Sequence, residues 1–265
     1  MGTGGMVYAS QLEPDWVEIT HLRLKLPRLG KAFEGFRLVQ VSDIHMGGWM
    51  NVKHFSYALR LALEQNADLL ALTGDFVIYN GERKVVAGVM DDLNEVFDML
   101  GDVPRVGVLG NHDLRTSPVD IRKMMEKHQI LDLTNRIHTI VRSGEYLHIA
   151  GVDDMLHGQP DLNKVLAALP KDGSAILLSH EPDFADESAR SARFDLQISG
   201  HSHGGQVVVP FIGPPYLPMG GLKYYNGLYR VGTMLQYTNR GIGMVEPFVR
   251  FNCRPEITVF TLQAG

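Results

Sequence analysis

The chain has 265 residues, of which 45% are hydrophobic and 21% are charged, a composition typical of a globular protein rather than a disordered or fibrous one. Its formal net charge of -5, without any long run of Lys and Arg, argues against a nucleic-acid-binding surface. The single cysteine, Cys253, excludes an intrachain disulfide and a cysteine-rich metal site.

The sequence contains no recognisable membrane segment. No stretch approaches the roughly 18 consecutive apolar residues of a transmembrane helix. Residues 1–12 have neither the basic region nor the apolar region of a signal peptide. We therefore expect a cytoplasmic or membrane-peripheral protein, or an exported or anchored one if a leader precedes residue 1.

Strands alternate with amphipathic helices along the chain. The hydrophobic pattern predicts strands at 37–42, 68–73, 105–109, 137–141, 146–152, 175–179 and 196–199. It predicts helices at 52–65, 85–100, 118–128, 161–169 and 183–191, followed by a β-rich final third with many glycines and prolines. No linker or repeat divides the chain, so we expect one α/β domain over 1–265, with 1–14 as a flexible N-terminal extension.

Polar residues follow five of the predicted strands. They are Asp43 and His45; Asp75; Asn111, His112 and Asp113; His180; and His201 and His203. Ligands of open α/β sheets bind at the carboxyl ends of the strands, so these side chains can converge on one crevice.

The residue types suit a pair of divalent cations. Asp43 and His45 are two positions apart, so in an extended strand both would point to the same face. The same spacing holds for His201 and His203. Carboxylates, imidazoles and one carboxamide, without a thiolate, favour Mn, Fe or Zn. The candidate ligands are Asp43, His45, Asp75, Asn111, His180, His201 and His203. That number is too large for one ion and fits two ions that share a carboxylate.

The ordered motifs resemble those of the calcineurin-like metallophosphoesterase family. They are D-x-H at 43–45, G-D at 74–75, G-N-H-D at 110–113, an isolated His180, and G-H-x-H at 200–203. The segments LSHEPD at 178–183, GGQ at 204–206 and NRGIG at 239–243 are similar to a bacterial subgroup. That subgroup contains membrane-associated phosphodiesterases and some UDP-2,3-diacylglucosamine hydrolases. The resemblance implies a four-layer αββα sandwich of two mixed sheets flanked by helices.

The resemblance also implies a role for each motif residue. Asp43, His45 and His203 would hold the first metal, Asn111, His180 and His201 the second, and Asp75 would bridge them. His112 would protonate the leaving group or stabilise the transition state, with Asp113 orienting it. Many relatives carry an acidic residue shortly after the bridging aspartate, whereas Phe76-Val77-Ile78 follows here.

The activity implied by the resemblance is hydrolysis of a phosphodiester or pyrophosphate bond through in-line attack by a metal-bridging hydroxide. The substrate would be a small or lipid-linked phosphoester such as UDP-2,3-diacylglucosamine, with peripheral membrane contact allowed and no protein partner implied. Two alternatives stay open at this point: a phosphomonoesterase or protein phosphatase on the same scaffold, and a non-catalytic metal-binding scaffold.

Two further segments have a structural and a functional interpretation. Residues 207–225 combine bulky apolar side chains with prolines and glycines, which predicts a loop that either packs under itself or meets an apolar ligand or membrane. Asp153 and Asp154 follow the predicted strand 146–152 and are either acids near the metals or an ordinary turn.

Overall fold

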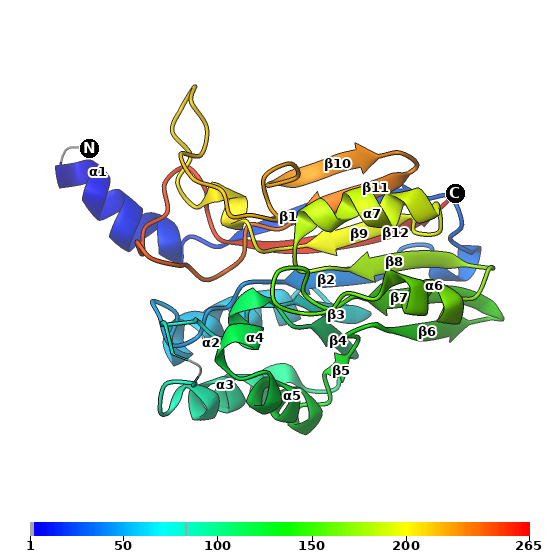
Figure 1. Ribbon diagram of the computed structural model, residues 1–265, viewed down its shortest axis with the longest axis horizontal. Helices are drawn as coiled ribbons and strands as arrows, with labels where there is room; N and C mark the ends of the chain where they lie inside the picture. Colours follow the sequence, from blue (N-terminus) through cyan, green and yellow to red (C-terminus); the bar gives the residue numbers. More distant parts are fainter. Residues whose placement is uncertain (1–2, 83) are drawn as a thin grey trace.

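Two six-stranded mixed sheets lie face to face, with helices over their outer faces (Figure 1). The computed structural model of the protein describes residues 3–82 and 84–265. This arrangement is the αββα sandwich that the resemblance predicted.

The first sheet has the strand order β1-β12-β2-β3-β4-β5. Its strands are β1 (Glu18–Leu26), β12 (Glu256–Ala264), β2 (Arg37–Val41), β3 (Leu69–Thr73), β4 (Arg105–Val108) and β5 (Leu131–Asp132). Only the β12–β2 pair is antiparallel among these described strands. Because β2, β3 and β4 are parallel to one another, their carboxyl ends lie at the same edge of the sheet.

The second sheet has the strand order β10-β11-β9-β8-β7-β6. Its strands are β10 (Gly227–Val231), β11 (Met234–Thr238), β9 (Leu196–Ser199), β8 (Ser174–Leu178), β7 (Glu145–Gly151) and β6 (Arg136–Arg142). The central strands β7, β8, β9 and β11 are parallel, and the edge strands β6 and β10 are antiparallel to their neighbours.

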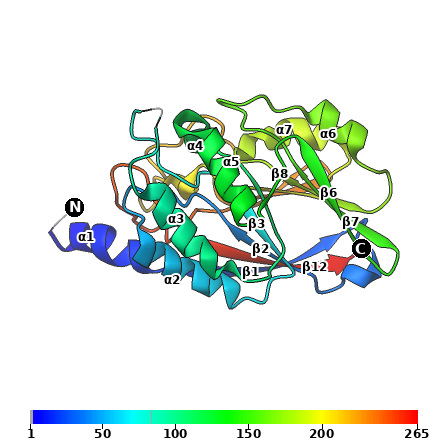
Figure 2. The same ribbon diagram turned by 90° about the horizontal axis from the view of Figure 1, so that it is seen from below.

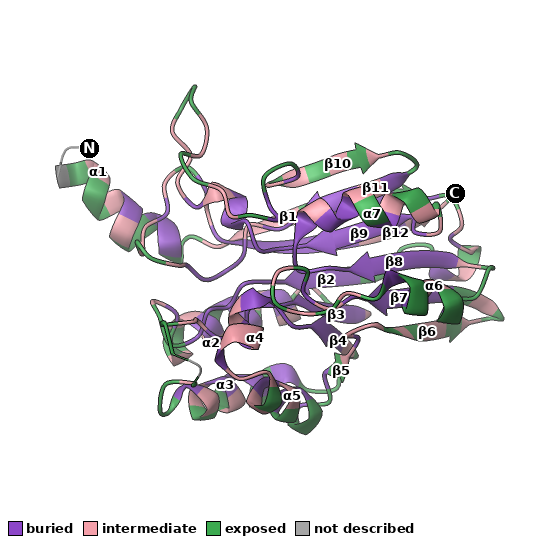
Figure 3. Cartoon of the chain, viewed as in Figure 1, coloured by how far each residue is buried: buried purple, intermediate pink, exposed green. Residues whose placement is uncertain are grey.

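Helices cover each sheet from outside, and apolar side chains fill the three interfaces between the layers. Helices α2 (Val52–Leu63), α3 (Val89–Phe97) and α5 (Pro118–Lys127) pack side by side on the first sheet (Figure 2). The second sheet is covered by α6 (Leu162–Ala168) and α7 (Ala185–Ser188). Between the sheets, side chains such as Leu38 and Ile198 form a buried layer. Figure 3 shows the central strands of both sheets mostly in the colour of buried residues.

The predicted elements are found with small shifts at their ends, and several elements were missed, including the helical N-terminal segment described below. The helix predicted from residue 85 begins at Val89, because Gly88 before it has a φ of 85°, outside the helical range. The prediction missed strand β1, the short strand β5, and helix α4 (Asn111–Thr116), which begins inside the G-N-H-D motif.

The N-terminal segment is helical over its described part. Helix α1 (Thr3–Val7) continues into helical turns at Tyr8–Leu12 and Glu13–Asp15. The carboxylate of Glu13 is fully buried and accepts hydrogen bonds from the backbone amides of Asn252 and Cys253. These bonds attach the end of the segment to the chain before β12. Within residues 3–82 and 84–265, no helix is both long and apolar enough to span a membrane.

We predict that Glu13→Ala loosens this attachment. The substitution leaves two amide donors without an acceptor, which should lower the free energy of unfolding by about 1 to 3 kcal/mol. Urea denaturation measures the loss, and amide hydrogen exchange should accelerate over residues 3–15. Asp15→Ala is the matched control, because Asp15 lies in the same turn and is exposed. Equal losses in the two variants would contradict the anchoring role of Glu13.

Candidate metal centre

The seven candidate ligands meet at one edge of the two sheets. Each follows the carboxyl end of a strand: β2, β3 and β4 in the first sheet, and β8 and β9 in the second. All seven side chains are buried: Asp43, His45, Asp75, Asn111, His180, His201 and His203. Buried polar side chains of this kind require partners, and here they face one another.

The first cluster contains Asp43, His45 and His203. The Nε2 atoms of His45 and His203 lie 2.9 Å apart. The Oδ1 atom of Asp43 lies 3.9 Å from the Nε2 of His45 and 3.6 Å from the Nε2 of His203. Two imidazole nitrogens and a carboxylate oxygen thus converge on one point, which is the donor set of a divalent cation.

The second cluster contains Asn111, His180 and His201. The Oδ1 atom of Asn111 lies 3.2 Å from the Nε2 of His180 and 2.9 Å from the Nδ1 of His201. The other nitrogen of each ring donates to a backbone carbonyl, His180 to Thr73 at 2.7 Å and His201 to Met219 at 2.9 Å. These outer bonds orient both rings, so the second nitrogen of each faces the cluster. Burial acts to lower the pKa of His180, but the carboxylates of Asp75 and Asp43 outweigh it and raise that pKa well above its usual value, so this ring must lose a proton when it binds a metal.

Asp75 lies between the two clusters. Its Oδ2 atom is 3.5 Å from the Nε2 of His45 and 3.2 Å from the Nε2 of His180. Its Oδ1 atom accepts a hydrogen bond of 2.8 Å from the backbone amide of His112. One oxygen is therefore held in place while the other faces both clusters.

Unusual backbone conformations aim these side chains. Asp43, His45, Asp75, His201 and His203 all have positive φ angles, from 52° to 70°. Non-glycine residues rarely adopt this conformation, and such strain is concentrated at functional sites. Glycine is also required at Gly110 and Gly200, because a Cβ atom there would collide with the carboxylates of Asp75 and Asp43, respectively.

Burial sets the protonation states at the site. It lowers the pKa of His201 to about 4 and the pKa values of His45 and His203 well below the usual range. These three rings are therefore neutral at neutral pH, the form that binds metals. Burial raises the pKa of Asp43 to about 6. Burial also acts to raise the pKa of Asp75, but the neighbouring histidines, His180 foremost, together outweigh it and hold that pKa well below its usual value.

His112 stands beside the clusters without belonging to either. Its Nδ1 atom accepts a hydrogen bond of 2.8 Å from the backbone amide of Tyr79. The ring proton of His112 is therefore on Nε2, because a proton on Nδ1 would point at the amide hydrogen of Tyr79 and prevent this hydrogen bond. Burial lowers the pKa of His112, which also favours the neutral ring.

The structure places Asp113 away from the ring of His112. Its carboxylate accepts from the backbone amides of Phe76 at 2.8 Å, Val77 at 3.2 Å and Gly110 at 3.0 Å. Asp113 is the third residue of α4, where a carboxylate turns back to the amide before the helix. The expectation that Asp113 orients His112 is therefore not met, and the amide of Tyr79 holds that ring instead. Burial raises the pKa of Asp113 to about 8.

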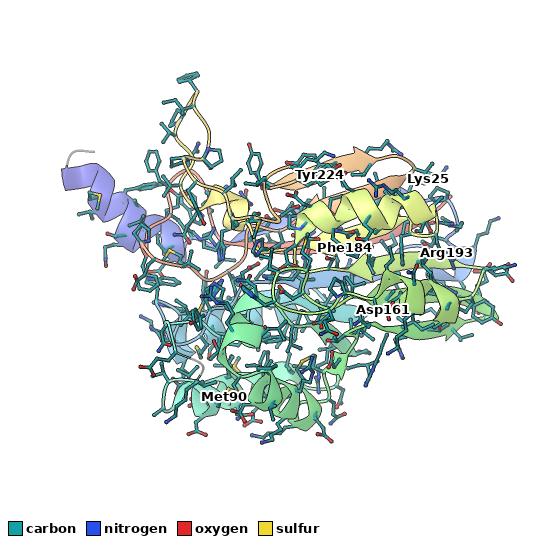
Figure 4. All side chains as sticks on the ribbon, in the orientation of Figure 1. Lys25, Met90, Asp161, Phe184, Arg193 and Tyr224 are labelled. Carbon is teal, nitrogen blue, oxygen red and sulfur yellow. The ribbon has the colours of Figure 1, made fainter. Side chains whose placement is uncertain are left out.

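A cavity of about 540 Å³ opens over the clusters. Its walls include Asp75 and His112 on one side and Val207, Tyr216 and Pro218 of the 207–225 loop on the other. Most of this loop lacks helix or strand, as predicted. The loop projects from the same end of the molecule as α1, and its side chains point outward (Figures 1, 2 and 4).

The tip of the loop does not pack under itself. Phe211 is 109% exposed and Ile212 is 80% exposed, values that fit neither a core nor a satellite cluster. Trp49 and Met50, which follow the first ligand pair in the sequence, do not line this cavity. Met50 is buried in the core beneath α2, and Trp49 stacks on His54 with ring centroids 4.1 Å apart.

Three residues around the site were missed or left open by the sequence. Glu181 is fully buried within the same group as His180 and His201, and it accepts from the amide of Met155 at 3.0 Å. Asp154 is also fully buried and contacts Glu181, whereas Asp153 accepts from turn amides. Glu181 lies within the LSHEPD segment at 178–183, but only the folded chain shows that it is buried beside two candidate ligands.

Arg250 is the third such residue. Its fully buried guanidinium donates to the carbonyls of Arg240, Gly241 and Gly243. These bonds fix the 239–243 segment, whose amide at Gly243 in turn donates to the carbonyl of Asp43 at 2.7 Å. The NRGIG motif thus supports the backbone of a candidate ligand.

Comparisons with known proteins agree with this geometry. Residues 36–205 match the family described as calcineurin-like phosphoesterase. The chain is 34% identical to the metallophosphoesterase YkuE of Bacillus subtilis, over 98% of this chain and 91% of that protein. It is 30% identical to the phosphodiesterase YaeI of Escherichia coli, over 98% of this chain and 93% of that protein.

More distant proteins share the same scaffold. A transmembrane protein with a metallophosphoesterase domain from Danio rerio is 28% identical over 98% of this chain, which spans 59% of that protein. The solved structure of the Thermus thermophilus sulfate thiohydrolase SoxB superposes with a TM-score of 0.50 at 12% identity, covering 87% of this chain and 57% of that one. This last similarity concerns the fold alone.

The family match covers more than half of the chain, and the two bacterial relatives are similar over almost its whole length. The clustered aspartates and histidines supply the metal-binding site that such enzymes need. This chain belongs to the calcineurin-like phosphoesterase family and is a metal-dependent phosphoester hydrolase.

Proposed function

We propose that the protein is a phosphodiesterase that uses two divalent cations. The observation that supports this proposal best is the position of Asp75, whose Oδ2 atom faces His45 of one cluster and His180 of the other. One cation would be held by Asp43, His45 and His203, the other by Asn111, His180 and His201, with Asp75 shared between them. Nitrogen and oxygen donors without a thiolate favour Mn, Fe or Zn.

The protein's part in the reaction is to bind and orient the phosphoryl group. Bound divalent cations neutralise the phosphoryl oxygens and activate water for attack at phosphorus. His112 would act as a hydrogen-bond donor through Nε2, stabilising the charge that develops on an oxygen in the transition state. Its Nδ1 atom already accepts from Tyr79, so the imidazolium needed for full proton transfer is disfavoured. Of the two roles expected for His112, this geometry favours transition-state stabilisation.

The substrate would carry an apolar portion. The cavity over the clusters is walled partly by Val207, Pro215 and Tyr216, and the exposed tip at Phe211 and Ile212 lies beyond it. Exposed apolar side chains grouped near a polar site are typical of proteins that bind lipids or membranes. A lipid-linked substrate such as UDP-2,3-diacylglucosamine fits this wall.

Peripheral membrane contact would accompany such a substrate. Met6, Val7 and Leu12 are exposed on the N-terminal segment, which lies at the same end of the molecule as the loop (Figures 1 and 3). The two apolar segments would then meet one lipid surface.

A panel of substrates tests the proposed activity. The manganese-loaded protein is assayed with bis-p-nitrophenyl phosphate, p-nitrophenyl phosphate and UDP-2,3-diacylglucosamine. Preference for the monoester p-nitrophenyl phosphate would favour a phosphomonoesterase. No hydrolysis of any of the three would favour the non-catalytic scaffold.

We predict that Asp75→Asn reduces metal content at both sites. Its carboxylate contacts both clusters, so replacing a negatively charged oxygen by an amide should weaken the binding of both cations. Elemental analysis after manganese loading should give about two equivalents per chain for the wild type and fewer than one for the variant. Asp68→Asn, which removes a carboxylate paired with Arg142 far from the clusters, is the control. A wild type that never exceeds one equivalent would contradict the two-cation proposal.

We predict that His112→Ala keeps the metals but slows turnover by about 100-fold to 1,000-fold, the usual contribution of one positioned donor. Because the ring stabilises charge without transferring its proton, the loss should be similar for aryl phosphodiesters with good and poor leaving groups. Measuring kcat across such a series decides this point. A loss that grows steadily as the leaving group becomes poorer would show general-acid catalysis instead.

We predict that Phe211→Ser combined with Ile212→Ser selectively impairs lipid substrates. Each exposed methylene that an acyl chain buries contributes about 0.8 kcal/mol, so losing a few contacts should raise KM by about tenfold or more. Hydrolysis of bis-p-nitrophenyl phosphate and the melting temperature should change little, since both side chains are solvent-exposed.

The matched control is Val141→Ser, an exposed apolar side chain on the edge strand β6. Vesicle co-sedimentation of the same variants separates membrane contact from substrate binding. An equal loss of activity on both substrates, with a lower melting temperature, would show that the loop is structural.

A further inference from the structure

Arg115 lies on the wall of the same cavity as Asp75 and His112. It is four residues after Asn111 and three after His112 on α4, so all three side chains project from one side of the helix. Among the described residues that line this cavity, Arg115 is the single Lys or Arg. It therefore supplies the one guanidinium or ammonium charge among the described residues of the cavity wall.

The guanidinium of Arg115 is positioned by stacking. It lies 3.8 Å from the centroid of the Tyr79 ring. Stacking holds the plane of the guanidinium and leaves its N–H donors unused. Within residues 3–82 and 84–265, no carboxylate forms a salt bridge with Arg115, whereas Arg122 and Arg142 pair with aspartates.

The segment after Asp75 makes this arrangement possible. It reads Phe76-Val77-Ile78-Tyr79 and contains no acidic residue that could neutralise the guanidinium. Tyr79 contributes its ring to Arg115 and its amide to His112. The arginine and the histidine are thus positioned by the same residue.

We propose that Arg115 binds a second phosphoryl group next to the one that is cleaved, so that the enzyme prefers pyrophosphate diesters over simple phosphodiesters. A planar guanidinium with free donors matches two oxygens of a phosphoryl group. Arg115 lies about one helical turn along α4 from Asn111 and lines the same cavity, so a substrate bound at the candidate ligands would extend along a wall that carries this guanidinium. This inference rests on the proposed phosphodiesterase function and narrows its substrate class.

Kinetics on two substrates test the assignment. With the manganese-loaded protein, kcat/KM is measured for ADP-ribose, which contains a pyrophosphate, and for bis-p-nitrophenyl phosphate, which contains one phosphate. Arg115→Gln should lower the ratio of the two values by about 10-fold to 100-fold, as expected for hydrogen bonds to a charged group. The ratio for Arg115→Lys should lie between those of the wild type and Arg115→Gln, because lysine keeps the positive charge but lacks the planar pair of donors.

Lys123→Gln is the matched control. It removes one positive charge from the neighbouring helix α5, where Lys123 is exposed and pairs with Asp120. The control should leave the substrate ratio at the wild-type value. An equal change in the ratio for Arg115→Gln and Lys123→Gln would reduce the effect to general electrostatics and overturn the proposal.

Equilibrium binding gives a second measurement that does not depend on turnover. Calorimetry compares methylenediphosphonate, which carries two phosphoryl groups, with methylphosphonate, which carries one. Arg115→Gln should weaken the diphosphonate about tenfold more than the monophosphonate. Equal weakening of both ligands, or none, would overturn the proposal.

The two proposals fail in different ways. A wild type that hydrolyses neither substrate would contradict the phosphodiesterase function, and the phosphonate comparison would still decide the role of Arg115. A wild type that hydrolyses both substrates with a ratio insensitive to Arg115→Gln would contradict only the second-phosphoryl site. A lower melting temperature with an unchanged ratio would mark the Tyr79–Arg115 stack as packing alone.

Discussion

The fixed position of the Asp75 carboxylate is the constraint on which the site depends. One oxygen is held by the amide of His112, so the other must face His45 and His180. Those two histidines come from different sheets, and therefore their separation is set by how the sheets pack. The buried layer that includes Leu38 and Ile198 thus determines the spacing of the clusters. Close-packed interiors transmit small changes in volume, so a core substitution there would reach the site.

The two metal clusters are also supported from outside by chain segments far away in sequence. Met219 in the projecting loop accepts from His201, and Arg250 fixes the segment that contacts Asp43. The loop that forms the apolar wall is therefore attached to a candidate metal ligand. The position of the loop and the orientation of His201 are linked through this one hydrogen bond.

Hydrophobic periodicity predicted the alternation of strands and helices, and the motifs after the strands predicted the set of residues that meet, because both are local signals. The αββα layers were implied by the resemblance that these motifs carry. The sequence did not predict the partners of Asp113, which depend on the turn geometry of a helix begun by the motif itself. It also could not show that Glu181 and Arg250 are fully buried, since their neighbours come from distant parts of the chain. Strand β1 was missed although Leu22, Leu24 and Leu26 alternate with Arg23 and Lys25, which is the local pattern of a half-buried edge strand.

The contacts of Asp113 explain how the 75–79 segment keeps its shape without a nearby acid. Asp113 accepts from the amides of Phe76 and Val77, and His112 accepts from Tyr79 while donating its own amide to Asp75. The two segments are therefore joined by hydrogen bonds in both directions. Because Asp113 is buried and bonded to three amides, its removal would leave donors unpaired beside Asp75. Asp113 thus acts on the site through the backbone around Asp75, and the G-N-H-D motif positions the Asp75 carboxylate as well as His112.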